Sequence, residues 1–398
     1  MAQKLIFATR HCYLDWSNGA SITAREILCA LAHFGWDVHV LTGCKLDSPD
    51  SIDQIIADRL LTDVRQLKPA SNSSFTLRVF NDHGIRSILF CPTIASKNPL
   101  PDEQKHFLRI LQSTIANIRP NILLTYDGDT LGYEILRMAK NARMKTVTLL
   151  QNLAYTHKEY FKDVDAVLVP SEFTKKYYAK TLRLKPVAIP PLMAKETPNF
   201  CKNGKQRQFV TFVNPAPGKG MAWFAKIAKV LSDKSPDIKF LVVEARGKID
   251  SLGLTGTLLL DVHNLYKMSI TPYPSEFLQV SKLMLIPSYY EETFGRVAVE
   301  AMMNGIPVIS SNRGALPEAV GDAGILLPIP GRFQPTSVEV PSDEEVAQWV
   351  DAITNLWYDN TAYRLMSQKG REYSAKWGWE VVAQQYTSFF SSLLNNRT

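Results

Sequence analysis

Short runs of apolar residues alternate with amphipathic stretches along most of the chain. The first apolar run, residues 5–9, is followed by a stretch of helical periodicity at 21–34 and by a second apolar run at 38–41. Four or five consecutive apolar residues are typical of a strand buried on both faces, whereas apolar residues at i, i+3 and i+4 predict an amphipathic helix. This strand–helix–strand order predicts a parallel sheet of the α/β class.

The same rhythm fills the first half and restarts after residue 207. The first half predicts strands also at 75–80, 85–90, 122–126, 146–150 and 166–169, and helices at 47–67, 102–118, 131–141 and 172–180. The second half predicts strands at 209–213, 239–243, 258–260, 283–286, 307–310 and 324–327, and helices at 221–234, 296–303, 343–357, 363–375 and 379–394. The proline-rich stretch 186–203 has the composition of a linker. We therefore expect two doubly wound domains, residues 1–190 and 191–378.

Composition and charge narrow the class of protein. The 398 residues are 45% hydrophobic and 21% charged, as in soluble globular proteins, and no apolar run approaches the roughly 18 residues of a membrane span. The five scattered cysteines indicate a reducing compartment, the cytoplasm. The net charge of +7, from 45 basic and 38 acidic residues, favours an anionic partner: a nucleotide diphosphate, an acidic membrane surface or a nucleic acid.

The stretch 287–318 carries the strongest candidate chemistry. It reads PSYYEETFGRVAVEAMMNGIPVISSNRGALPE. Glu292 precedes the predicted helix 296–303 and Glu300 lies inside it, so the two carboxylates are expected to contact different parts of one ligand. The unpaired N–H groups and partial positive charge of the helix N-terminus at 294–297 suit an anion. Two solvent-facing charges on a surface helix are the alternative.

The whole string resembles the signature of the retaining, nucleotide-sugar-dependent glycosyltransferases of family four. Their usual pattern, E-x-F-G-x(4)-E-A-M-x-x-G-x-P-V-I, is matched at every fixed place between Glu292 and Ile309. The resemblance implies the GT-B fold: two Rossmann-like doubly wound α/β domains that face a cleft. It also implies that the last helix, within 379–398, crosses back onto the first domain.

The resemblance assigns roles in the donor grip. Glu300 would accept hydrogen bonds from ribose hydroxyls, and Glu292, the first catalytic candidate, would hold hydroxyls of the transferred sugar. The helix N-terminus would position the sugar and stabilise the departing diphosphate. The donor-binding residues implied in this stretch are Thr293, Phe294, Gly295, Arg296, Val297 and Glu300.

A glycine-flanked lysine begins the second domain's first helix. Lys219, between two glycines, suits a phosphate, since it combines a point charge with close backbone approach. The spacing is not that of a Walker loop. In the resembled family a Lys-Gly pair follows an arginine, and together they neutralise the diphosphate. Lys219 and Gly220 match that pair, whereas Asn214 replaces the arginine. Arg246, in a loop that seats the nucleotide base in the family, or Arg296 would then supply the second cation.

The first domain matches the family less closely. A glycine turn after the first strand approaches the donor phosphates there, and Gly19 and Ala20 occupy that place, with alanine in place of a second glycine. A plain strand-to-helix turn is the alternative. The family commonly places a histidine after the strand 146–150, whereas this chain has Asn152 there and His157 further on. Asn152 and His157 are therefore the remaining catalytic candidates, with a surface position as the alternative for His157.

Two further features leave alternatives open. Asp127-Gly128-Asp129 resembles a metal-binding Asp-x-Asp, but its doubly wound context favours a turn with acceptor contact. Residues 172–185 combine five basic residues with two tyrosines, which suits an acidic lipid surface. A solvated helix face is the alternative, and no motif for nucleic acid accompanies the charge.

The resemblance predicts a retaining glycosyltransferase that moves a hexose, with glucose preferred, from a UDP-sugar to a saccharide or lipid-linked acceptor in exopolysaccharide or glycolipid synthesis. No metal and no cofactor beyond the UDP-sugar substrate is expected. The protein would be cytoplasmic, with peripheral contact at the inner face of the plasma membrane left open. A non-catalytic nucleotide-sugar binder and a sucrose- or trehalose-type synthase on the same fold are the alternatives.

Overall fold

The computed structural model divides into two compact units. It describes residues 2–69, 74–92, 101–193, 207–245, 247–249 and 262–395. The first unit comprises Met1–Pro170, Thr174–Leu192 and Glu380–Thr398, and the second comprises Ser171–Phe173 and Met193–Trp379. The predicted strand at 258–260 lies outside the described residues.

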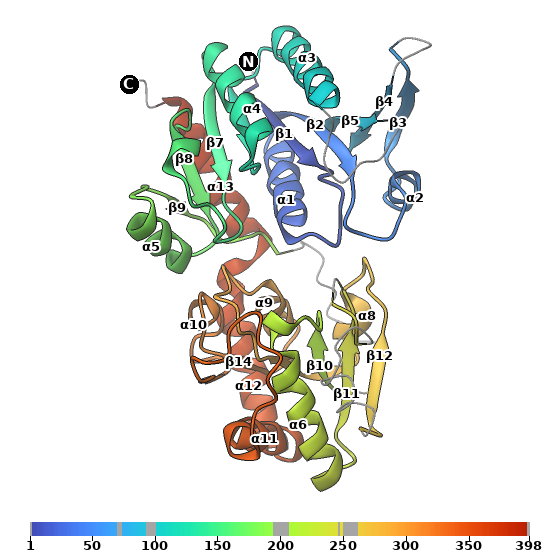
Figure 1. Ribbon diagram of the computed structural model, residues 1–398, viewed down its shortest axis with the longest axis vertical. Helices are drawn as coiled ribbons and strands as arrows, with labels where there is room; N and C mark the ends of the chain where they lie inside the picture. The colour runs from blue at the N-terminus through green and yellow to red at the C-terminus, as the bar shows by residue number, and fades with distance from the viewer. Residues whose placement is uncertain are drawn as a thin grey trace. The chain divides into compact units, whose positions relative to one another are not determined.

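The first unit is built on a sheet whose described strands follow the order β3-β4-β5-β2-β1-β6-β7-β8-β9 (Figure 1). The pairs from β5 to β9 are parallel. Its strands are β1 (Lys4–His11), β2 (Asp37–Lys45), β3 (Thr62–Leu67), β4 (Phe75–Asp82), β5 (Ile85–Pro92), β6 (Ile122–Thr125), β7 (Lys145–Leu149), β8 (Ala166–Val169) and β9 (Val187–Ala188). Its helices are α1 (Gly19–His33), α2 (Ile52–Asp58), α3 (Pro101–Ile118), α4 (Thr130–Asn141), the 3-10 helix η1 (Lys158–Phe161), α5 (Glu172–Thr181) and the C-terminal α13 (Trp379–Asn395).

The prediction of one long helix at 47–67 is wrong. Only α2 is helical, and residues 62–67 form the edge strand β3, which pairs antiparallel with β4. β4 in turn pairs antiparallel with β5. All six residues of β3 are exposed, so this strand has no buried face that a hydrophobic pattern could reveal. Its conformation comes from pairing with β4, which is a long-range contact.

Helix α13 packs in the first unit although the elements that precede it belong to the second. The Tyr386 hydroxyl donates to the Ile189 carbonyl at 3.2 Å, and the ring centroid of Phe390 lies 6.1 Å from that of Trp36. Tyr386 and Phe390 are fully buried. The expectation that the last helix crosses back onto the first domain is therefore confirmed.

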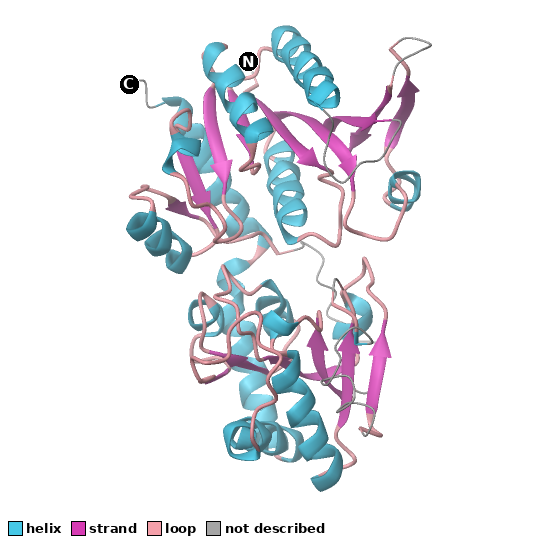
Figure 2. Ribbon diagram, in the orientation of Figure 1, coloured by secondary structure: helices cyan, strands magenta, loops and turns pink. Residues whose placement is uncertain are grey.

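The second unit has a parallel sheet of order β12-β11-β10-β13-β14-β15 among the described strands. These strands are β10 (Phe209–Val213), β11 (Lys239–Val243), β12 (Leu265–Met268), β13 (Ser281–Ile286), β14 (Val308–Ser311) and β15 (Ile325–Leu327). The helices are η3 (Pro217–Lys219), α6 (Met221–Lys234), α8 (Ser275–Leu278), α9 (Arg296–Met303), α10 (Leu316–Val320), α11 (Asp343–Tyr358), α12 (Asn360–Ser374) and η5 (Ala375–Trp377). Figure 2 shows helices against the strands in both units, and the α/β prediction with parallel sheets is confirmed.

The loop between β15 and α11 is anchored in the core of the second unit. Phe333 is fully buried, and its ring meets Trp223 edge-on with centroids 5.0 Å apart. The Arg313 guanidinium donates to the carbonyls of Phe333, at 2.6 Å, and Pro330, at 2.9 Å. The side chain of Phe333 is therefore part of the hydrophobic core, and Arg313 fixes the loop backbone above it.

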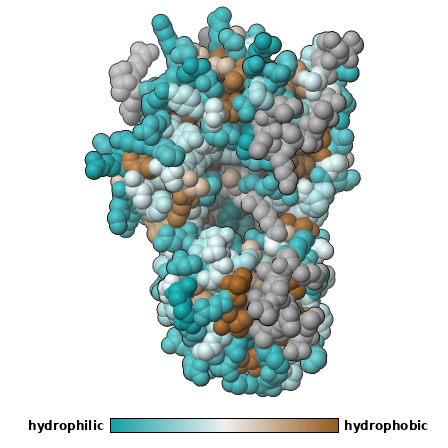
Figure 3. All heavy atoms as spheres, viewed as in Figure 1, coloured by the Kyte–Doolittle hydropathy of each residue, from teal (hydrophilic) through white to brown (hydrophobic). Residues whose placement is uncertain are grey.

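Within the described ranges, no helix combines the length and apolar content needed to cross a bilayer. Figure 3 shows hydrophilic residues over most of the face in view, with smaller apolar areas among them.

Candidate functional site

Two loops of the second unit meet after β10 and β13, the strands at the middle of its sheet. The Gly218 carbonyl accepts hydrogen bonds from the backbone N–H groups of Tyr289, at 2.8 Å, and Tyr290, at 3.1 Å. A Cβ at Gly218 would lie 2.3 Å from the ring of Tyr290, and one at Gly220 would lie 1.7 Å from the Pro287 carbonyl oxygen. Gly220 also has φ of 82°, in the left-handed region that favours glycine. The glycines that flank Lys219 therefore allow the loops to touch.

This contact places Lys219 against Glu292. The lysine Nζ lies 2.6 Å from Glu292 Oε1, and their side chains are 30% and 16% exposed. The buried Ser288 hydroxyl donates to the same carboxylate oxygen at 2.7 Å. The tertiary structure thus joins a cation and an anion, 73 positions apart in the sequence, in one half-buried cluster.

A third loop fixes the backbone of Glu292. The Ala315 N–H donates to the Glu292 carbonyl at 2.7 Å. Gly314, with φ of 61°, lies so close that a Cβ there would be 2.4 Å from the Glu292 backbone nitrogen. Glu292 is therefore held from both its side chain and its main chain.

Helix α9 begins directly after this cluster. Its N-cap, Gly295, has φ of 102° and no side chain. The backbone N–H groups of the first turn therefore receive no hydrogen-bond acceptor from a capping side chain. Arg296 and Glu300 pair one turn apart, with NH2 and Oε1 at 3.3 Å, and both are 18% exposed. Phe294 is buried with its ring edge-on to Trp377 at 5.8 Å. Phe294 thus anchors the start of the helix, while Thr293 and Val297 flank the same turn.

Asn214 shapes the neighbouring loop. Its backbone adopts φ of 63°, its N–H donates to the Val243 carbonyl at 2.8 Å, and its Oδ1 accepts from the Gly247 N–H at 3.0 Å. The side chain therefore ties the loop after β10 to the loop after β11. Arg246, the predicted second cation, lies outside the described residues, and Arg296 is in contact with Glu300.

In the first unit, a side-chain cap already serves the amides of Ala20 and Ser21. Asn18 Oδ1 accepts from the N–H groups of Ala20, at 3.0 Å, and Ser21, at 3.4 Å. No atom lies within 4 Å of a Cβ built on Gly19, so this glycine is not required by close packing. The geometry is that of an ordinary capped helix start, and a contact of Gly19 or Ala20 with a donor stays a prediction.

Asn152 and His157 are both exposed and lie in the segment between β7 and η1. Asn152 Oδ1 accepts from the Ala154 N–H at 2.9 Å, and its carbonyl accepts from the Tyr178 hydroxyl at 2.6 Å. The ring centroid of His157 lies 6.3 Å from that of Tyr160. Asn152 thus lies close after β7 and His157 directly before η1, and their catalytic roles stay predictions.

Arg10, which the sequence patterns did not single out, organises the Asp127–Asp129 turn. Asp127 accepts from the Thr9 hydroxyl at 2.6 Å and from the Arg10 N–H at 2.7 Å. Burial raises the pKa of Asp127 to about 6. Asp129 pairs with the Arg10 guanidinium at 3.2 Å and caps α4 by accepting from the Gly132 N–H at 3.0 Å. Both carboxylates thus have structural partners, and the described residues include no group of three or more His, Cys, Asp or Glu placed to hold a metal.

Comparisons with known proteins bear on both halves of the chain. Residues 195–373 match the family described as glycosyl transferases group 1. The D-inositol 3-phosphate glycosyltransferase of Corynebacterium glutamicum is 26% identical over 190 residues, which cover 45% of this chain and 42% of that protein. The lipopolysaccharide 1,2-N-acetylglucosaminetransferase of Salmonella typhimurium is 24% identical over 324 residues, 73% of this chain and 77% of that protein. This chain thus matches less than half the length of the inositol phosphate enzyme.

Solved structures match over nearly the whole chain. Sucrose-phosphate synthase of Thermosynechococcus elongatus superposes with a TM-score of 0.70 at 18% identity, covering 99% of this chain and 100% of that one. Anabaena HepE, in complex with UDP and glucose, gives 0.66 at 14% identity, covering 98% and 100%. At such identities the likeness concerns the fold. The chain has the fold of the GT-B glycosyltransferases, and its residues 195–373 match the family described as glycosyl transferases group 1.

Proposed function

We propose that this protein is a retaining glycosyltransferase that moves a hexosyl group, with glucose preferred, from a UDP-sugar to a saccharide or lipid-linked acceptor. The observation that carries the proposal is the cluster of Lys219 and Glu292 beside the start of α9, inside the domain of the group 1 family. The uridine nucleotide and the glucosyl group are suggested by HepE, whose structures hold UDP and UDP-glucose.

The cluster supplies the complementary charges that a nucleotide sugar needs. The Lys219 ammonium and the N–H groups that begin α9 would bind the diphosphate, because a lysine and a helix N-terminus both favour negative charge. The Glu292 carboxylate would accept hydrogen bonds from hydroxyls of the sugar. Since the two side chains lie 2.6 Å apart, the diphosphate and the transferred sugar would be gripped at adjoining points.

Glu300 would hold the ribose. A carboxylate can accept from two neighbouring hydroxyls at once, and Arg296, with NH2 3.3 Å from Glu300 Oε1, keeps the carboxylate oriented. Because Glu300 lies one helical turn beyond the first amides of α9, ribose and diphosphate would bind along the same helix end.

Transfer would break the bond between the anomeric carbon and the phosphate oxygen. Negative charge then builds on the departing UDP, where Lys219 and the α9 amides stabilise it electrostatically. The acceptor hydroxyl attacks the anomeric carbon from the same face, and its proton passes to the departing phosphate oxygen. The configuration is retained without a covalent enzyme intermediate, and these protein groups take the place that a metal ion would have.

The decisive experiment uses purified protein, labelled UDP-glucose and other UDP-sugars, and a panel of saccharide and lipid-linked acceptors. We expect UDP release that depends on an acceptor, an α-linked product from an α-linked donor by NMR, and unchanged rates in EDTA. A product of inverted configuration would contradict retention, and activity lost in EDTA would contradict metal independence.

The alternatives predict different results in the same assay. A non-catalytic nucleotide-sugar binder, suggested by Asn152 and Asn214 in place of the family histidine and arginine, would bind UDP without consuming any donor. A sucrose- or trehalose-type synthase would use fructose, a sugar phosphate or glucose as acceptor. Donor binding with no turnover on any acceptor would overturn the enzymatic proposal.

We further propose that the α5 region contacts an anionic membrane surface. Lys176, Lys180, Arg183 and Lys185 are all exposed, and Val187 beyond them is 40% exposed. Each basic residue near an anionic surface contributes about 1 kcal/mol of attraction, which salt screens. The contact would bring the enzyme to a lipid-linked acceptor.

Co-sedimentation with phosphatidylserine vesicles tests this contact. We expect salt-sensitive binding that the double variant Lys176→Glu/Lys180→Glu abolishes. The control Lys105→Glu/Arg109→Glu makes the same charge change on exposed residues of α3 and should reduce binding only slightly. Equal losses in the two variants, or no sedimentation of the wild type, would refute a dedicated surface.

A further inference from the structure

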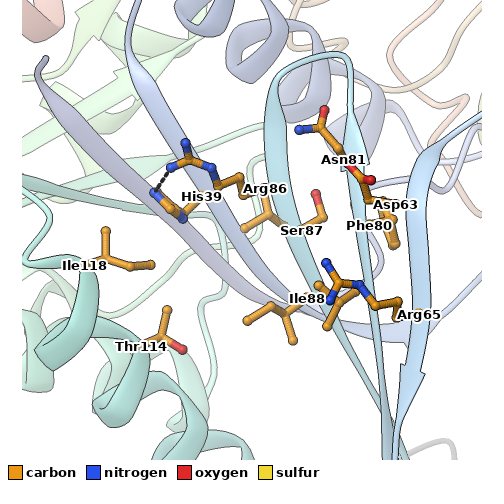
Figure 4. A pocket seen from close by; sticks show the side chains of 12 residues that line it. His39, Asp63, Arg65, Phe80, Asn81, Arg86, Ser87, Ile88, Thr114 and Ile118 are labelled. Carbon is orange, nitrogen blue, oxygen red and sulfur yellow. Dashed lines mark hydrogen bonds between the residues drawn. The ribbon is translucent and has the colours of Figure 1, made fainter.

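A pocket of about 290 Å³ opens in the first unit (Figure 4). It lies at the amino-terminal ends of β2 and β5, with the C-terminal end of α3 and the edge strand β3 as its other walls. Gly19 and Asn152 follow the carboxyl ends of β1 and β7. Because these neighbouring strands are parallel, the pocket lies at the opposite edge of the same sheet.

One wall carries a polar cluster on β2 and β5. The Arg86 NH1 donates to Asp37 Oδ1 at 2.6 Å and lies 3.5 Å from His39 Nε2, as the dashed line in Figure 4 shows. Arg86 keeps 65% of its side chain exposed, so most of its donors remain available to a ligand. Burial lowers the pKa of His39, so its ring is neutral at physiological pH.

The facing wall comes from β3 and the end of β4. Asp63 and Arg65 are exposed, and within the described ranges the Arg65 guanidinium has no hydrogen bond or ion pair. The Asn81 carboxamide reaches the same space, with its Oδ1 already accepting from the Gly84 N–H at 2.7 Å. Donors and a carboxylate acceptor thus both line the pocket.

The floor is apolar. Val79, Ile88 and Ile118 line it and are each half-buried, so they present carbon surface to whatever enters. An apolar floor within a rim of convergent polar groups is the usual composition of a small-molecule site. The volume lies at the lower end for such sites, about 300–1,000 Å³, which leaves room for one ring and not for a nucleotide sugar.

The balance of charge selects among small ligands. The lining residues Arg65 and Asp63 carry opposite charges, and Arg86 is paired with Asp37, which lies outside the lining, so the formal charges of these four groups sum to zero. An anion would gain little from Arg86, since Asp37 already neutralises that arginine at 2.6 Å, and beside Arg65 it would also meet the Asp63 carboxylate. A neutral ligand with many hydroxyls uses both donors and acceptors, and the C–H face of its ring covers the apolar floor.

We propose that this pocket binds one neutral pyranose unit of a saccharide, at a site separate from the transfer chemistry. None of its residues is among those assigned to donor or acceptor, so the proposal does not depend on transferase activity. If the acceptor is a saccharide, the pocket would hold a sugar unit remote from the reacting end and keep the chain attached between transfers.

Saturation-transfer NMR with methyl α-D-glucopyranoside, methyl α-D-mannopyranoside and methyl α-D-galactopyranoside tests the proposal in the presence of saturating UDP. We expect at least one glycoside to bind. Thr114→Trp, which fills the pocket from α3, should weaken that binding at least tenfold, and Arg65→Ala several-fold. The matched controls are Ser113→Trp, on the exposed side of the same helix, and Arg109→Ala, an exposed arginine of α3. Both should bind as the wild type does.

The proposal would be overturned if Thr114→Trp bound the glycoside as tightly as the wild type does and had an unchanged melting temperature. It would also be overturned if none of the three glycosides bound to the wild type. Displacement of the glycoside by millimolar inorganic phosphate would overturn the neutral character of the ligand. Glu300→Gln should leave this binding intact while it removes transferase activity. Failure of the pocket and failure of the proposed function are therefore distinguishable.

Discussion

Replacement of Lys219 by alanine is the sharpest test of the proposed donor grip. The Lys219 Nζ lies 2.6 Å from Glu292 Oε1 and is 30% exposed, so it can reach a ligand that enters beside Glu292. The substitution removes this charge and leaves the hydrogen bond from the Ser288 hydroxyl to that carboxylate oxygen in place. A diphosphate would then meet Glu292 without the neighbouring cation.

The expected magnitude follows from the type of contact. A hydrogen bond to a charged group contributes about 1.5–3 kcal/mol, which corresponds to roughly a 10- to 150-fold weaker Kd for UDP. The effect on folding should be much smaller, because a partly exposed ion pair contributes about 0.2–1 kcal/mol to the free energy of unfolding. Binding and folding should therefore respond differently to the same change.

Isothermal titration calorimetry with UDP measures the effect, and Lys229→Ala is a matched control. Lys229 is also 30% exposed and also ion-paired, with its Nζ 3.0 Å from Asp233 Oδ1, but it lies on α6 beyond the loop. Both variants lower the net charge by one. We expect Lys219→Ala to lose affinity as calculated and Lys229→Ala to stay within about twofold of the wild type.

Equal affinities for UDP in Lys219→Ala and the wild type would refute the reasoning, since the cation would then not face the diphosphate. Equal losses in Lys219→Ala and Lys229→Ala would also refute it, because the effect would then come from net charge. Melting temperatures of both variants should lie close to that of the wild type.

Three other substitutions test different parts of the structure. Glu300→Gln should weaken UDP binding about tenfold in calorimetry. The same substitution should weaken the binding of deoxyuridine diphosphate less, because that nucleotide lacks the ribose 2′-hydroxyl. Equal losses of affinity for both nucleotides would contradict contact between Glu300 and the ribose. Phe333→Ala should lower the free energy of unfolding by about 3–5 kcal/mol in urea titrations, because the ring is fully buried against Trp223, whereas a change below about 1 kcal/mol would show that the loop is not a core element. Burial raises the pKa of Asp127 from 3.8 to about 6. The contribution of the protonated carboxyl to the free energy of unfolding is therefore fully present below about pH 4 and is lost as the pH rises through about 6. The uncharged Asp127→Asn should therefore gain up to roughly 3 kcal/mol relative to the wild type between pH 4 and 7, and a difference independent of pH would contradict this.

Much of the fold followed from local pattern. Residues 209–213 were predicted as a strand and form β10, and 296–303 were predicted as a helix and form α9. Such elements can be predicted from the sequence because buried parallel strands are short apolar runs and the apolar positions of helices repeat every 3.6 residues. Helix α1 begins at Gly19, two residues before the predicted start at 21. Asn18 caps the helix at this point, and the apolar pattern does not show the first two helical residues.

Long-range contacts could not be predicted from the local sequence pattern. Residues 62–67 form an edge strand because they pair with β4. Phe333 belongs to the core because its ring packs on Trp223 and its carbonyl accepts from Arg313. Arg10 gave no local signal, because its importance lies in Asp127 and Asp129, more than a hundred residues away.

The sequence by itself determined the glycine turns, the spacing of Glu292 and Glu300 around a helix start, and the lysine between two glycines, because these depend on neighbouring residues. Only the tertiary structure decided that Lys219 meets Glu292 at 2.6 Å and that Arg65 and Arg86 face one pocket. For Lys219 and Glu292 the physical reason is that the adjacent parallel strands β10 and β13 deliver their loops to one edge of the sheet. The side chains that meet there are neighbours through strand order, which no local pattern records.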